Sequence, residues 1–134
     1  MTMQPARLRA RVWVDACLGA CRAAGVFATV LARGDDDAGS VLVKWRRPDG
    51  SGGVLAPHTT LEGDRTWMLA TGSEPVGEPV SDAYWQRQRD RDPDLWVVEV
   101  ESESLWHPLG EAIDSASQSQ KGSTEKSASD LFKR

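Results

Sequence analysis

The segment of residues 95–101, with the sequence LWVVEVE, constrains the fold of this chain more than any other segment. Trp96, Val98 and Val100 alternate with a second set of side chains, so the two sets point to opposite faces of a strand. The second set begins apolar and ends in two glutamates. The strand is therefore expected to be buried on both faces at its start and to reach water at its end. The chain must build a sheet around it.

The remaining elements follow from periodicity and turn residues. Helical spacing of apolar residues, with Gly25 placed as a left-handed cap, predicts a first helix. The turn Pro48-Asp49-Gly50 predicts a hairpin, and Pro93 ends a second helix because it restricts the residue before it. The predicted order is helix 12–24, strands 26–32, 41–46, 53–56 and 65–71, helix 80–91 and strand 95–101.

This order predicts an α+β fold: a small, mainly antiparallel sheet of about five strands packed with two helices. Short connections between the strands favour hairpins, and we expect both helices on one face of the sheet. We assign residues 7–110 to a single domain. Residues 111–134 include six serines and few apolar side chains. Such a segment cannot bury enough surface to offset its ordering entropy, so we expect a flexible, disordered tail.

Charge and cysteine content limit the function classes. The net charge is −4, and the acidic excess lies before residue 111, which disfavours nucleic acid as a partner. The chain offers no signal-peptide pattern and no apolar run of membrane-spanning length, so we expect a cytoplasmic protein without membrane contact. Cys17 and Cys21 lie four residues apart on the first helix. We interpret them as small buried residues, because no second pair completes a zinc site.

Three segments together resemble a known family. They are Trp13-Val14 with Ala16, the run from Arg33-Gly34-Asp35 through Asp37-Ala38-Gly39 into Val41-Leu42-Val43-Lys44, and residues 92–101. In these segments the chain resembles an alphaproteobacterial family of small proteins, known only as domain of unknown function family 1491. The likeness spans roughly residues 7–108. It implies a compact bacterial α+β protein, and it implies no activity, cofactor or catalytic residue.

Asp35, Asp36 and Asp37 form an acidic loop with two interpretations. Three carboxylates are candidate ligands for Mg²⁺ or Ca²⁺, which prefer oxygen donors. The spacing does not follow the EF-hand pattern. Aspartates beside Gly34 and Gly39 are also typical of turns in which the side chain bonds to the backbone. The pattern favours the turn, so we predict no metal and no other cofactor, and we keep a metal-dependent enzyme as an alternative.

Aromatic residues suggest a binding surface. Trp13, Trp45, Trp67 and Trp96 occupy positions where periodicity places core residues. Tyr84 and Trp85 are adjacent on the second helix, so both rings cannot face the core directly. With Arg87 and Arg91 they form a candidate protein-binding patch, since interfaces are enriched in aromatic residues and arginine. Packing at the edge of the core is the alternative for these rings.

No group of residues predicts catalysis. His58 and His107 each lie beside a proline in an expected loop, and no frame places a nucleophile, a base and an orienting group together. The leading hypothesis is a small non-enzymatic interaction or regulatory module with another protein as partner. A small enzyme using the acidic loop and a nucleic-acid-binding protein are the alternatives. The sequence does not indicate an oligomeric state.

Overall fold

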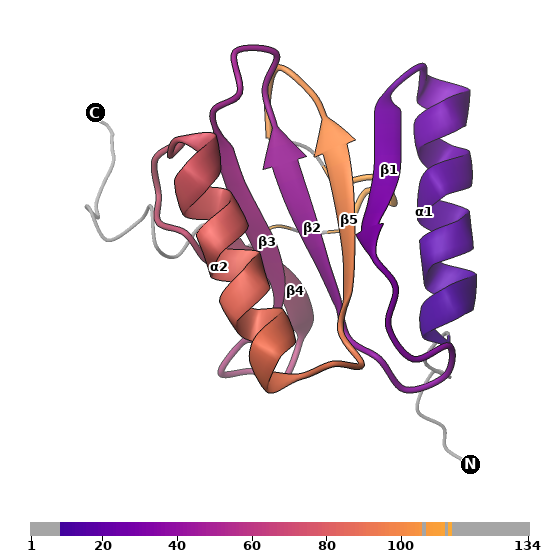
Figure 1. The fold of residues 1–134 in the computed structure, drawn as a ribbon. Helices are drawn as coiled ribbons and strands as arrows, with labels where there is room; N and C mark the ends of the chain where they lie inside the picture. The colour runs from indigo at the N-terminus through magenta and orange to yellow at the C-terminus, as the bar shows by residue number, and fades with distance from the viewer. Residues whose placement is uncertain (1–8, 106, 112, 114–134) are drawn as a thin grey trace.

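The computed structural model describes residues 9–105, 107–111 and 113, and it contains the seven elements in the predicted order (Figure 1). In chain order they are α1 (Ala10–Ala24), β1 (Phe27–Ala32), β2 (Val41–Arg46), β3 (Gly52–Thr59), β4 (Arg65–Leu69), α2 (Glu78–Arg91) and β5 (Trp96–Glu101). Both helices begin two residues earlier than the sequence predicts, and β3 ends three residues later. The α+β fold class is confirmed.

The five strands form one sheet in the order β1-β5-β2-β3-β4. Neighbouring strands are antiparallel except β2 and β5, which run parallel. The mainly antiparallel sheet is therefore confirmed. The last strand in the sequence, β5, is inserted between β1 and β2. A strand with apolar side chains at its start on both faces is stable inside a sheet, where neighbours satisfy both of its edges.

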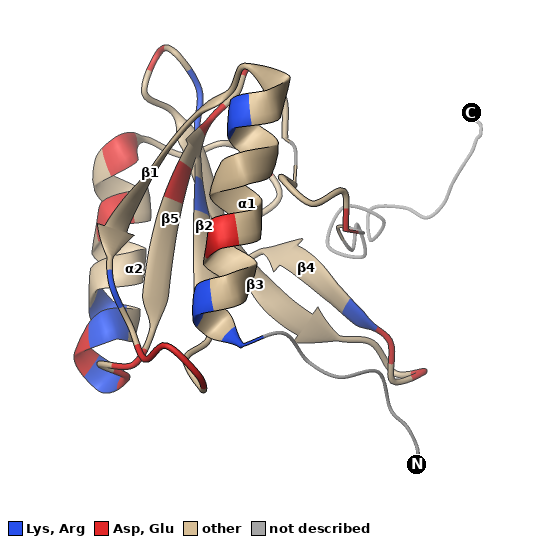
Figure 2. Cartoon of the chain, turned by 90° about the vertical axis from the view of Figure 1, so that its right-hand side faces the viewer, with Lys and Arg blue, Asp and Glu red and all other residues tan. Residues whose placement is uncertain are grey.

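The two helices lie on opposite faces of the sheet, so the expectation of one helical face is wrong (Figures 1 and 2). α1 packs on β1 and β5, and α2 packs on β3 and β2. The physical reason is the alternation of side chains along the central strands. Val43 and Val98 join the apolar cluster under α1, whereas Leu42 and Val97 join a second cluster under α2. Each apolar face of the sheet therefore needs a helix that shields it from water.

α1 is positioned by one apolar stripe. Ala10, Val14, Cys17 and Cys21 recur at helical spacing and are all buried against the sheet, as expected for an amphipathic helix. Gly25 adopts a φ of 72° and donates its N–H to the last turn of the helix. This is the left-handed cap that the sequence predicts, and it turns the chain directly into β1.

α2 buries much less of itself. Ser81 is the residue of this helix that is fully buried. Pro79 lies in the first turn, where its missing N–H costs nothing, and the backbone N–H of Asp92 bonds to Gln88 at the other end. The apolar contact of α2 with the sheet comes from the partly buried Tyr84 and Trp85, so this helix depends more than α1 on polar contacts.

The predicted tail falls mostly outside the described residues. Of residues 111–134, the structure describes Glu111 and Ile113, and both contact Trp67: Glu111 by a hydrogen bond and Ile113 by a parallel β-bridge. The disorder expected for the rest of the tail stays a prediction. Within the part of the chain that is described, no helix has the length and apolar character needed to cross a membrane.

Candidate functional site

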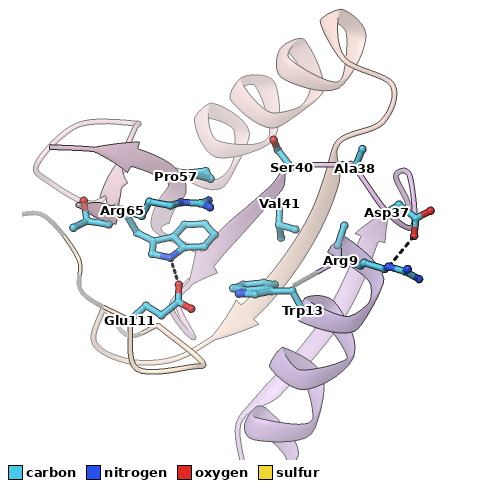
Figure 3. A pocket seen from close by; sticks show the side chains of 13 residues that line it. Arg9, Trp13, Asp37, Ala38, Ser40, Val41, Pro57, Arg65 and Glu111 are labelled. Atoms are coloured by element: carbon cyan, nitrogen blue, oxygen red, sulfur yellow. Dashed lines mark hydrogen bonds and ion pairs between the residues drawn. The ribbon is translucent and has the colours of Figure 1, made fainter. Parts of the chain in front are cut away.

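A groove opens on the α1 face of the sheet, between the start of α1 and the ends of β3 and β4 (Figure 3). Its volume is about 710 Å³. Trp13 from α1 and Trp67 from β4 line the groove together, and Val41 and Pro57 also line it. α1 packs mainly on β1 and β5, so the β3–β4 end of this face has no helix over it. Uneven coverage of the sheet therefore creates the groove.

The two tryptophans of the groove are held by neighbours. Their ring centroids are 5.4 Å apart with 30° between the planes, and the His107 ring packs against both. The Trp67 indole N–H donates to Glu111 Oε1 at 2.7 Å. Trp67 is buried, whereas Trp13 keeps part of its surface in the groove. The aromatic wall is therefore preformed, which lowers the entropy cost of binding.

Charged side chains stand at the rim. Arg9 pairs with Asp37 at 3.7 Å, with both side chains largely exposed. Arg65 is exposed at the β4 side, and no side chain of the described residues forms an ion pair with it. Glu111 bonds to Trp67. The groove thus combines an apolar interior with a rim of both signs, in which Arg65 is available to a ligand anion.

His107 lies behind the aromatic wall and is only 3% exposed, so its expected place in a surface loop is wrong. Its Nδ1 accepts the backbone N–H groups of Leu109 and Glu111, at 3.1 and 3.4 Å. Burial lowers the pKa of His107, and the nearby Glu111 carboxylate only partly opposes this. The ring is therefore neutral and carries its proton on Nε2, which is 3.9 Å from Glu111 Oε1. The sequence showed only a histidine beside a proline.

The acidic loop works as a structural element. The Asp35 carboxylate accepts the backbone N–H groups of Asp37 and Ala38, the turn that the pattern favours. The backbone carbonyls of Asp36 and Asp37 accept the first N–H groups of α1, at 2.9 and 3.4 Å. A helix start needs such acceptors, and here the loop supplies them in place of a capping side chain.

The loop also packs on β5. A Cβ added to Gly34 or Gly39 would collide with the Asp94 carbonyl oxygen, and the Trp96 indole donates to the Asp35 carbonyl at 2.7 Å. Figure 2 shows its acidic residues beside the arginines at the start of α1. Among the described residues, no three His, Cys, Asp or Glu side chains are arranged to hold a metal ion.

The predicted binding patch on α2 is split by the fold. Tyr84 and Trp85 are half-buried, and both pack against the smaller apolar cluster of Leu42, Val54, Leu95 and Val97. The Trp85 indole donates to Asp82 at 2.9 Å. Arg87 and Arg91 are exposed. A binding role for these four residues stays a prediction, with the two arginines as its accessible part.

Lys44 is the charged residue that sequence reasoning missed. It is 3% exposed in the middle of β2, and its ammonium pairs with Glu78 at 2.7 Å, Asp82 at 2.7 Å and Glu99 at 3.0 Å. Burial alone lowers the pKa of Lys44, but these three hydrogen bonds outweigh it and raise the pKa above its usual value. The lysine stays charged, and it ties the first turns of α2 to β2 and β5.

The lysine also acts on its partners. The bond with Lys44 holds the pKa of Glu78 below its usual range, with Arg46 contributing. Burial raises the pKa of Asp82, but its bond with Lys44 reverses this, so its pKa also lies below the usual value. The only sign of this burial in the sequence is the alternation of side chains along β2. It puts Lys44 on the same face as Leu42, opposite the side chains of Val43 and Trp45.

The structure also shows where the two cysteines and His58 lie. Cys17 and Cys21 are free and buried under α1, as expected. Burial raises the pKa of the Cys17 thiol to about 12, which keeps it protonated at neutral pH. His58 lies within β3 rather than in the expected loop, because the strand runs on to Thr59.

Comparison with known proteins gives one consistent result. A family described as protein of unknown function (DUF1491) matches residues 8–110. A crystal structure of a member from Caulobacter crescentus CB15 is 38% identical with a TM-score of 0.71, covering 81% of this chain and 100% of that chain. An NMR structure of a Caulobacter crescentus CB15 member is 36% identical, with a TM-score of 0.68, covering 82% and 99%.

A solution structure of a protein from A. tumefaciens is 28% identical, with a TM-score of 0.65, and covers 81% of this chain and 98% of its own. A search of curated proteins finds no match. The matched region holds both helices, all five strands and most of the groove. The fold and the family match agree with the resemblance seen in the three segments: this chain belongs to the DUF1491 family of proteins of unknown function.

Proposed function

We propose that this protein is a small non-enzymatic interaction module whose groove binds an extended segment of a partner protein. The observation that carries the proposal is the preformed wall of Trp13 and Trp67 beside Arg65, which forms no ion pair with any residue that the structure describes. Aromatic-lined grooves are a recurring way to bind extended, proline-containing peptides, because such peptides lose little entropy on docking.

The shape of the groove favours a peptide over a small substrate. A volume of about 710 Å³ would suit either. The groove is however partly open to solvent, and the histidine and the two cysteines that the structure describes near it are not free to react. His107 Nδ1 is occupied by two backbone N–H groups, and the Cys17 and Cys21 thiols are buried on the α1 stripe. A general base or nucleophile needs a free, accessible atom.

The rim indicates which segment would fit. A proline or aromatic side chain would pack on the exposed part of Trp13 and on Pro57, which are apolar side chains of the groove. An aspartate or glutamate one or two residues away would reach Arg65, whose guanidinium can form a paired hydrogen bond with a carboxylate. The expected partner segment is therefore extended, contains proline and carries an acidic residue.

A selection from displayed peptides on the full chain tests this proposal. We expect enriched sequences to combine proline or an aromatic residue with Asp or Glu, and a synthetic peptide of that sequence to shift the indole N–H signals of Trp13 and Trp67 in NMR spectra. Arg65→Glu should lower the affinity for this peptide by about tenfold, which corresponds to the loss of roughly one charge-assisted hydrogen bond. Enriched peptides without acidic residues, or binding unaffected by Arg65→Glu, would contradict the groove proposal.

The α2 surface provides the matched control. Arg91→Glu makes the same charge change at an exposed position on the other face of the sheet, and it should leave the groove peptide unaffected. If Arg91→Glu or Arg87→Glu weakens the selected peptide while Arg65→Glu does not, the partner binds the patch of Tyr84, Trp85, Arg87 and Arg91. Arginine variants are preferable to Trp85→Ala there, because Trp85 also packs in the core.

A further inference from the structure

The outer edge of β1 is an unpaired sheet edge. β1 pairs with β5 on one side, and no strand of the described residues pairs with its other side. The free backbone N–H and C=O groups along such an edge are a template for another strand. Proteins usually protect an edge with charged residues, proline or a bulge.

β1 has little of this protection. Its six residues, FATVLA, include no charge and no proline, and Phe27 is 74% exposed. The protection that it does have is a change of register between Val30 and Ala32, which places Leu31 in a bulge. The regular part of the edge is thus a short, uncharged segment of residues 27–30 that carries an exposed aromatic ring and ends at the bulged Leu31.

We propose that this edge pairs antiparallel with β1 of a second copy of the chain, with the two-fold axis at Thr29. Directly opposed residues in an antiparallel pair share one face of the sheet. In this register Phe27 meets Leu31 of the partner subunit, Ala28 meets Val30 of the partner subunit, and Thr29 meets its own counterpart. Cross-strand aromatic–aliphatic and Thr–Thr pairs stabilise sheets.

The neighbouring register is a poorer match. With the axis at Ala28, Phe27 would oppose Thr29 of the partner subunit, and Leu31 would find no partner within the strand. The axis at Thr29 instead uses the whole regular segment together with Leu31 at the bulge, and it covers the exposed Phe27 ring with an aliphatic side chain. Residues 27–31 are therefore self-complementary in one register, as a two-fold interface requires.

The flank of α1 above this edge supports the same symmetry. At 100° per residue, Asp15, Leu18 and Arg22 lie on the flank opposite to Trp13, which faces the groove. That flank therefore overhangs β1, on which α1 packs. A two-fold axis between the copies sets the two helices antiparallel, so Asp15 faces Arg22 of the partner subunit across Leu18. Charges of opposite sign meet, and none of like sign is forced together.

Sedimentation equilibrium of the full chain, up to about 0.5 mM, tests the pairing, because a short edge contact is expected to be weak. We expect a monomer–dimer equilibrium. Thr29→Lys places two ammonium groups opposite each other and should weaken the dimer by about tenfold or more. Within one copy this lysine would lie next to Glu99, which is the β5 partner of Thr29, so the fold should tolerate it. Thr29→Val keeps the strand and should leave the dimer intact.

Cysteine trapping tests the register itself. In Thr29→Cys, two cysteines meet on the axis, and a mild oxidant should link them into a covalent dimer that breaks on reduction. Cys17 and Cys21 are buried, so they do not compete. Ser73→Cys, at an exposed position in the loop between β4 and α2, is the control and should stay monomeric.

A wild-type chain that stays monomeric throughout would overturn the proposal, and so would a dimer that Thr29→Lys does not weaken. Arg65→Glu lies at the groove and should not change the association. The dimer and the groove function can therefore fail independently.

Discussion

The two faces of the sheet hold their helices by different forces. The α1 face buries thirteen residues in one cluster, including Trp45, Trp67 and Trp96, whereas the α2 face buries four. α1 contributes four buried side chains to its face, and α2 contributes Ser81. Apolar packing, which is nondirectional and insensitive to pH, holds α1.

α2 is held by one buried cation in addition to the partly buried rings of Tyr84 and Trp85. Lys44 reaches from the sheet to Glu78 and Asp82 on the helix and to Glu99 beside it. A helix with little buried apolar surface can therefore still be fixed to a sheet when its acidic residues pair with a buried lysine. Such a network depends on every partner, because removing one leaves the others uncompensated. The four predictions below test this contrast, in order of expected effect.

Lys44→Met should have the largest effect. It removes the cation and leaves three carboxylates close together. The expected loss of unfolding free energy is about 3 kcal/mol, the lower end for a broken buried pair, because the carboxylates keep some access to water. Urea unfolding measures it. Arg46→Met is the control, since Arg46 is more exposed and should cost about 1 kcal/mol or less. Equal losses in both variants would mean that burial of Lys44 adds nothing.

Cys17→Ser tests the apolar side of the contrast. It keeps the size of the side chain but puts a hydroxyl in a fully buried position. We expect a loss of about 1–3 kcal/mol in urea unfolding, and Ala16→Ser at an exposed position of the same helix should change little. A Cys17→Ser protein as stable as the wild type would show that this face tolerates polar groups as α2 does.

On the α1 face, His107 makes the stability of the protein depend on pH. Its pKa is 6.5 in the unfolded chain and lower in the folded protein, so below pH 6.5 the unfolded state binds protons first. Stability is therefore complete above that pH and falls as the pH drops, by about 1 kcal/mol between pH 7 and pH 5. In His107→Asn the amide oxygen can accept the same backbone N–H groups. This dependence should disappear from its thermal unfolding, and if it persists another group is responsible.

The smallest expected effects on stability come from replacing two aspartates of the acidic loop. Asp35→Ala removes the acceptor of two backbone N–H groups and should cost about 1 kcal/mol. Asp37→Ala removes an exposed pair with Arg9 and should cost about 0.3 kcal/mol or less. Thermal unfolding of both variants gives the comparison. A larger loss for Asp37→Ala would mean that its charge, rather than the turn, holds the start of α1.

Local patterns predicted the elements because they depend on near neighbours. The alternation in residues 95–101, the stripe of Val14, Cys17 and Cys21, and the cap at Gly25 all appear as expected. Each reflects a local period or a backbone conformation. Sequence reasoning was wrong at His107 and at the side of α2, which depend on contacts between residues far apart in the chain. It was also wrong at His58, which pairing with β4 keeps within β3.

The sequence by itself determined the number, type and order of the elements, the burial of both faces at the start of β5 and the turn made by Asp35. Tertiary structure alone decided that β5 enters between β1 and β2 and that the helices cover opposite faces. It also brought Lys44 to Glu78 and Trp13 to Trp67. The reason is physical: a strand pattern states which side chains share a face, but only pairing states which strand lies beside it. The groove exists because of that pairing.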